Sequence, residues 1–175
     1  MSSRKILVPL ASLLAAGAVA VGSGATFTSS TSNTISAVTS GTLSQTNSKS
    51  NAAIFSLTNI KPGDTVNGSL TITNTGSLPA TFGLTENSST NGFGAGDLAL
   101  VITNTTTNTV VYTGDFGGLE DNTKQSLGVV QPGDANSYRF SVTLAPTAPN
   151  TDQGKTANAV YTWDSVQLDG ATTNQ

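Results

Sequence analysis

The side chains that most often carry out chemistry in proteins are scarce in this chain. It has 175 residues and contains no histidine and no cysteine. Without imidazole or thiol groups it cannot build a Ser–His–Asp triad, a Cys–His nucleophile or a zinc site with histidine or cysteine ligands. The sequence therefore predicts a protein that is not an enzyme, with no catalytic residues, no metal site and no cofactor.

Carboxylates are the remaining candidates for chemistry. Two paired carboxylates can hydrolyse a glycosidic bond, and carboxylate oxygens can bind calcium. The candidates are expected in or beside loops: Glu86, Asp115, Glu120 and Asp121. They show no pairing and no EF-hand spacing, which favours a solvated acidic loop over 114–125. Calcium binding by that loop stays open.

The elements that position these residues are strands introduced by two Pro-Gly-Asp turns, at 62–64 and 132–134. Proline presets φ, glycine supplies the conformation that other residues avoid, and aspartate can bond its own backbone. After each turn every second residue faces one side: Val66, Gly68, Leu70 and Ile72, then Tyr138, Phe140, Val142 and Leu144. This period of two indicates strands with one buried face.

The remaining patterns complete an all-β domain over residues 51–175. Alternation resumes after the turn Asn74–Gly76, so 59–84 is predicted to be a β-hairpin-like unit. Further strands are expected at 52–57, 98–102, 109–112, 127–130 and 156–168, the last with Trp163 in the core. About seven or eight strands at this spacing predict a jelly-roll-like antiparallel β-sandwich.

Residues 1–25 have the pattern of a cleaved secretory signal. Arg4 and Lys5 precede an uncharged apolar run over 6–22 that ends in small residues. Cleavage after Ala20 or between Ala25 and Thr26 fits the small-residue rule, and a membrane anchor is the alternative. No second hydrophobic span follows, so we expect no stable membrane span after cleavage and a secreted location, in the extracellular matrix or at the cell surface.

Residues 26–50 are predicted to form an extended N-terminal segment. They are almost entirely Thr, Ser, Asn and Gly, with four large apolar residues spread among them: Phe27, Ile35, Val38 and Leu43. Such a segment suits an extended strand that completes another sheet, although a linker or the domain's own first strand also fits. The net charge of −3 and the absence of a basic cluster beyond residue 5 predict no nucleic-acid partner.

Five segments give the chain a resemblance to the TasA/camelysin family of secreted bacterial matrix and surface proteins: 21–27, 40–43, 55–64, 74–78 and 161–167. The resemblance implies a jelly-roll-like sandwich and cleavage near Ala25 by a dedicated signal peptidase. The central region is shorter here, and most of 26–39 matches only loosely. These motifs are turns and strand patterns, which indicate the fold and family more than an activity.

The resemblance and the strand pattern together favour a structural subunit of extracellular or biofilm matrix fibres. Some members of the family polymerise when the N-terminal segment of one subunit fills a groove in the next as a donor strand. The partner would then be the chain itself, as a homopolymer, with Phe27, Ile35, Val38 and Leu43 as candidate anchors. Other matrix proteins or cell-wall polymer are further candidate partners.

Two other classes of function stay open. A monomeric cell-surface binding or adhesion module is compatible with a β-sandwich, because a fold does not determine a function. A peptidase like the camelysin relatives described as metallopeptidases is disfavoured, since histidine and the His-Glu-x-x-His helix are missing.

Overall fold

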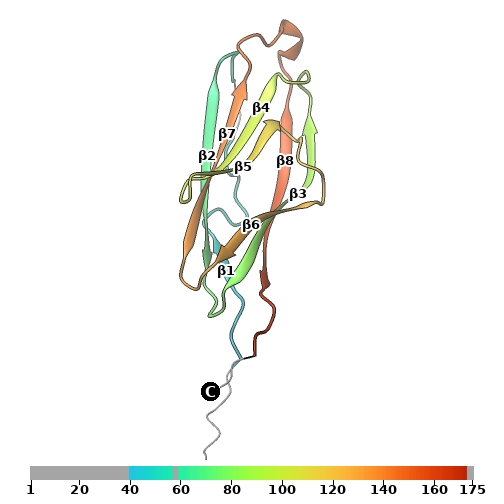
Figure 1. Cartoon of the computed structure of the whole chain (residues 1–175). Coiled ribbons are helices and arrows are strands. Elements are labelled where there is room, and N and C mark those ends of the chain that lie inside the picture. Colours follow the sequence, from blue (N-terminus) through green and yellow to red (C-terminus); the bar gives the residue numbers. More distant parts are fainter. Residues whose placement is uncertain (1–39, 57–58, 173–175) are drawn as a thin grey trace, which may run out of the picture. The chain divides into compact units, whose positions relative to one another are not determined.

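The computed structural model describes residues 40–56 and 59–172 (Figure 1). These residues form eight strands and one short 3₁₀ helix: β1 (Gln45–Asn47), β2 (Thr65–Asn74), β3 (Ala80–Asn91), β4 (Leu98–Asn104), β5 (Thr109–Asp115), β6 (Lys124–Val130), β7 (Ala135–Leu144), η1 (Asn150–Asp152) and β8 (Ala157–Gln167). No helix within these ranges is long and apolar enough to cross a membrane.

The strands form two antiparallel sheets that enclose one core. The five-stranded sheet has the order β1-β2-β7-β4-β5, and the three-stranded sheet has the order β6-β3-β8. The fifteen buried apolar side chains form a single cluster, to which both sheets contribute. The predicted all-β, antiparallel β-sandwich is therefore confirmed.

The two Pro-Gly-Asp turns close the ends of the central strand pair. β2 and β7 pair along nine residues, from Thr65 opposite Thr143 to Thr73 opposite Ala135. The Gly63 N–H donates to the Leu144 carbonyl at 2.8 Å, and the Gly133 N–H donates to the Asn74 carbonyl at 2.9 Å. Each turn precedes one of the two strands and is hydrogen-bonded to the last residue of the other strand. The glycines have φ values of 90° and 83°, which favour glycine at these positions.

The predicted alternation places the core residues correctly. Leu70 and Ile72 of β2 and all four alternating residues of β7 are buried. The Tyr138 and Trp163 rings lie 4.9 Å apart, and Trp163 packs against the buried cluster, which confirms its predicted place in the core. Burial in these apolar surroundings raises the pKa of Tyr138 to about 12.

The predicted hairpin-like unit over 59–84 is wrong, because β2 and β3 belong to different sheets. The turn after Asn74 carries the chain from one layer to the other. The Asn74 side chain, fully buried, donates to the Leu78 and Val130 carbonyls at 2.9 Å and accepts from the Gly76 N–H at 3.0 Å. These bonds satisfy the backbone where the chain crosses between the sheets.

Two local expectations also need correction. Residues 52–56 form no strand, although Ile54 and Phe55 pack against the core as their apolar character suggests. β3 continues to Asn91 past an irregularity between Glu86 and Ser88, so Glu86 lies in a strand and not in or beside a loop. β1 lies within the predicted extended segment 26–50 and pairs with the end of β2, as in the alternative that this segment supplies a strand of its own domain.

Candidate functional site

One flank of the sandwich carries a long strand edge without a partner. β8 forms the margin of the three-stranded sheet and pairs with β3 along eleven residues. Along its other edge no strand of the described residues pairs with it. We call this outer edge of β8, together with residues 53–56 beside it, the open flank.

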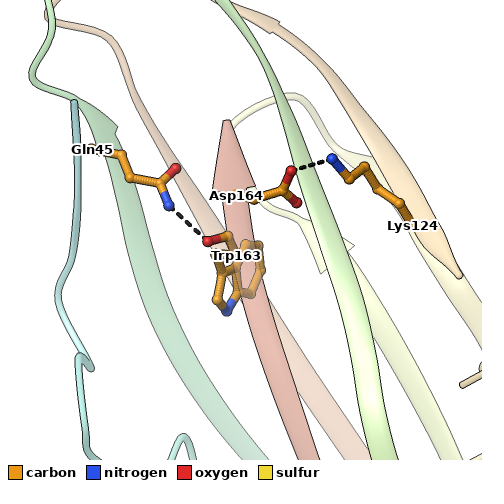
Figure 2. A network of polar contacts seen from close by, with 4 residues as sticks. All are labelled: Gln45, Lys124, Trp163 and Asp164. Carbon is orange, nitrogen blue, oxygen red and sulfur yellow. Dashed lines mark hydrogen bonds and ion pairs between the residues drawn. The ribbon is translucent and has the colours of Figure 1, made fainter. Parts of the chain in front are cut away.

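The backbone groups of the open flank follow from the pairing of β8. The Trp163 carbonyl accepts a hydrogen bond from the Gln45 side-chain amide at 2.8 Å, so it points away from β3 (Figure 2). In an antiparallel strand the N–H and C=O of one residue face the same side, and residues two apart repeat that side. Tyr161, Ala159 and Ala157 therefore also present their backbone groups outward.

Residues 53–56 run between the two sheets along this flank. The Phe55 ring lies 6.3 Å from Phe140 and 6.4 Å from Phe116, so its side chain enters the core. A Cβ atom at position 68 would lie 2.5 Å from the Ile54 carbonyl oxygen, which explains why β2 has a glycine there. A cleft of about 290 Å³ remains between 53–56 and the first half of β8, and Ala157, Ala159 and Tyr161 line it.

The chain enters this domain beside the turn that joins the two sheets. The Thr42 N–H donates to Ser77 Oγ at 2.8 Å, and the Ser77 N–H donates to the Thr42 carbonyl at 2.9 Å. The Ser44 carbonyl accepts from the backbone N–H groups of Thr75 and Gly76. These bonds fix residues 42–44 to their own domain.

Five of the six residues proposed as donor-strand anchors or as the cleavage site lie outside the described ranges. These are Phe27, Ile35 and Val38 of the candidate donor segment and Ala25 and Thr26 of the candidate cleavage site. The fourth proposed anchor, Leu43, is described and is 43% exposed. The roles of all six residues stay predictions.

Three of the four acidic candidates lie in or beside a loop, as predicted, and Glu86 is the exception. Asp115 ends β5 and binds the Gly96 N–H at 3.0 Å, whereas Glu120 and Asp121 lie in the following loop. Asp164 of β8 forms an ion pair with Lys124 of β6 (Figure 2). The two side chains meet over β3, where Gly83 leaves room for them. Within the described ranges no three acidic side chains are grouped closely enough to hold a metal ion.

Sequence reasoning missed the backbone edge of β8. The strand predicted over 156–168 is present as β8, with Ala157, Ala159, Tyr161 and Trp163 on its inner face, but side-chain alternation carries no information about which edge of a strand is paired. The Gln45 contact was also missed, since a lone polar residue in a Thr/Ser/Asn-rich segment carries no signal of its own.

Comparison with known proteins supports the family resemblance. Residues 4–84 match the model of the camelysin metallo-endopeptidase family, which confirms the predicted resemblance to the TasA/camelysin family. No curated protein matches the chain. Among solved structures, the ASH/PapD-like domain 7 of human CEP192 is similar at 13% identity, with 83% of this chain and 99% of that chain covered and a TM-score of 0.32.

The family description implies a catalytic metal, and the residues of this chain do not fit one. Catalytic zinc is held by three protein ligands, almost always including histidine or cysteine. Neither residue occurs in the sequence, and the carboxylates of the described residues form no group of three. We therefore derive no metallopeptidase chemistry for this site.

Proposed function

We propose that this chain, which resembles the camelysin family over residues 4–84, is an exported structural subunit that assembles into fibres of an extracellular matrix. Assembly proceeds by β-strand addition: the segment before residue 40 of one subunit pairs with the open flank of the next. The observation that carries this proposal is the eleven-residue β8, which has an unpaired outer edge in the described part of the chain. Such an edge binds an extended segment through main-chain hydrogen bonds.

The length of the free segment suits this role. With cleavage after Ala25, residues 26–39 give fourteen residues ahead of the bonds that fix 42–44 to the domain. Fully extended, they span up to about 46 Å, and the eleven residues of β8 span about 36 Å. The segment can therefore cover the whole edge of a neighbouring β8 and retain a few residues as a connection.

Side-chain alternation within the segment predicts which residues face the acceptor. Phe27 and Ile35 are eight residues apart and share one face of an extended strand, whereas Val38 falls on the other face. The small inward side chains of Ala157 and Ala159 leave the 290 Å³ cleft in which an apolar anchor can be buried. We expect Phe27 and Ile35 to be the principal anchors. Leu43 is bound to its own domain through its neighbours.

The proposal is tested by electron microscopy and sedimentation of the chain purified from Thr26, with Phe27→Ser and Ile35→Ser as single variants. Thr31→Ser is the matched control, because it changes the same segment without removing an apolar anchor. We expect regular fibres from the parent and the control, and far fewer from the anchor variants. A further variant combines Phe27→Ser with Ile35→Ser, and fibre formation by this double variant at the parental rate would refute strand addition by this segment.

A synthetic peptide of residues 26–39 provides a second test that leaves the protein unchanged. It should occupy the open flank, cap growing fibres and shift the protein towards monomers in proportion to its concentration. A peptide carrying both Phe27→Ser and Ile35→Ser is the control. If the parent protein stays monomeric under all conditions, a monomeric surface-binding module becomes the leading function.

A further inference from the structure

Three carboxylates from separate parts of the chain meet at the loop that joins β3 to β4. Asp97 ends this loop, Asp115 ends β5, and Asp152 ends the 3₁₀ helix. The Gly96 N–H donates to Asp115 Oδ2 at 3.0 Å, and the Gly94 N–H donates to Asp152 Oδ1 at 3.3 Å. Gly94 also abuts Asp97 Oδ2 so closely that a Cβ atom there would overlap it. Asp97 and Asp152 are therefore brought together around Gly94.

Asp152 is an unusual residue to bury at this position. Its side chain is only 9% exposed, and its second oxygen, Oδ2, is buried without a hydrogen-bond partner. A buried carboxylate oxygen without a donor loses its hydration and gains nothing in return. Native proteins seldom leave such an atom unsatisfied, so it calls for a partner that the protein itself does not supply.

The neighbouring Asp97 carboxylate makes the arrangement more costly. Desolvation raises the pKa of Asp97 most, followed by repulsion from Asp152, a side-chain hydrogen bond with Asp152 and then repulsion from Asp115. The two ion pairs of the described residues, Lys61–Asp64 and Lys124–Asp164, involve none of the three. The stem of Lys155 passes Gly92, but its ammonium forms no ion pair with these carboxylates.

We propose that Asp97 and Asp152 bind a calcium ion, with the buried Asp152 Oδ2 as one ligand and Asp115 as a nearby third negative charge. Backbone oxygens and water complete the coordination, because no three acidic side chains within 40–56 and 59–172 lie close enough to bind one ion together. Of the acidic residues of the predicted loop over 114–125, the site uses only Asp115, and it assigns no role to Glu120 or Asp121. Asp152 also lines a cleft of about 770 Å³, which gives the ion a path from solvent.

The ligand chemistry favours calcium over other divalent cations. Only oxygen ligands are present, and calcium accepts an irregular set of them, whereas magnesium requires a near-ideal octahedron. Two direct carboxylates predict a modest affinity, with a dissociation constant of about 10⁻⁴–10⁻³ M, as in other extracellular modules. A bound ion would add to the hydrogen bonds that already join the β3–β4 loop to the segment after β7, and it would offset the repulsion between their carboxylates.

The test uses the chain from Thr26, stripped with a chelator, and measures thermal unfolding and calorimetric binding during titration with CaCl₂. We expect a saturable rise in melting temperature and one bound calcium per chain, with a much smaller response to MgCl₂. Asp97→Asn and Asp152→Asn should abolish both responses. The matched control is the double variant Glu120→Gln, Asp121→Asn, which removes two exposed acidic residues and should respond as the parent does.

The variants also distinguish a calcium site from the alternative explanation, in which the Asp97 and Asp152 carboxylates share a proton. Asp97→Asn removes the repulsion, so it should raise the melting temperature in chelator while losing the calcium response, which shows that the variant is folded. A parent that is insensitive to calcium but more stable at acidic pH would overturn the proposal. So would a calcium response that both aspartate variants retain. The experiment is made independent of fibre formation by repeating it on the variant that combines Phe27→Ser with Ile35→Ser, which the proposed function expects to stay monomeric and which retains Asp97 and Asp152.

Discussion

Glu86 is the buried carboxylate that most directly links stability to pH. It is 1% exposed, and neither of its oxygens has a hydrogen-bond partner of good geometry. Desolvation raises its pKa above 4.5, and the Asp121 charge adds to this, while Ser89 and Tyr161 oppose it more weakly. The folded state therefore binds the Glu86 proton more tightly than the unfolded state. Stability from this group is present below pH 4.5 and is lost as the pH rises through the folded pKa.

Glu86→Gln should remove this dependence, because glutamine stays neutral. We expect the variant and the parent to have similar stability below pH 4.5, and the variant to become the more stable of the two as the pH rises to neutrality. Urea unfolding followed at several pH values measures the difference. Glu120→Gln, an exposed glutamate, is the control. A difference between Glu86→Gln and parent that stays constant with pH would show that Glu86 titrates normally.

Asn74 holds the point where the chain passes from one sheet to the other. Asn74→Ala would remove the side-chain donor to the Leu78 and Val130 carbonyls, and the Gly76 N–H would keep only its bond to the Ser44 carbonyl. Because these groups lie in a buried site, we expect a loss of about 3 kcal/mol in the free energy of unfolding. Asn158→Ala, at an exposed position of β8, should change it by less than about 0.5 kcal/mol. Equal effects of the two substitutions would contradict the proposed importance of the crossing.

At the scale of the element, the outward N–H groups of β8 make a sharp prediction. Ala159→Pro removes a backbone donor from the open flank while leaving the hydrogen bonds to β3, and proline is tolerated on an edge strand. We expect a folded protein by circular dichroism that no longer accepts a donor strand. Mixed with parent subunits, it should still donate its own segment and so cap fibres at one end. Normal fibres from the variant alone would exclude β8 as the acceptor.

The sequence predicted the strands well but their partners less well. Alternation in β2 and β7 shows which face of each strand is buried, because the apolar side chains occupy only the face that is shielded from water. It does not report which strand lies alongside, so the turn after Asn74 was assigned to a hairpin although it joins two sheets. The strand predicted from residue 52 is absent for a related reason: Ile54 and Phe55 pack against the core, but their backbone pairs with no strand.

The candidate sites were less accessible to sequence reasoning than the fold. The open flank depends on backbone groups of Ala157 and Ala159, whose side chains carry no functional signal. Asp97 and Asp152 are 55 residues apart, and only the folded chain brings their carboxylates together at Gly94. What the sequence could indicate was the class of chemistry, because the absence of histidine and cysteine is a property of composition alone.

For the whole molecule, net charge should control how fast subunits associate. Without residues 1–25 the chain has five basic and ten acidic residues, a net charge of −5 at neutral pH. Identical subunits therefore repel one another as they approach, while the segment 26–39 carries no charged side chain of its own. Salt screens this repulsion, since the Debye length falls from about 30 Å at 0.01 M to about 8 Å at 0.15 M.

We therefore expect assembly of the chain from Thr26 to be faster at about 0.15 M NaCl than at about 0.01 M, because screening weakens the repulsion between like-charged subunits. Light scattering, with chelator present to exclude calcium effects, measures the rate. Ala159→Pro is the control, because salt should not make it scatter if the increase comes from strand addition. A rate that is independent of salt would indicate that a step within the subunit, such as opening of the flank beside residues 53–56, limits assembly. Salt-dependent scattering by Ala159→Pro would instead indicate unspecific precipitation of the kind that any protein carrying net charge can undergo.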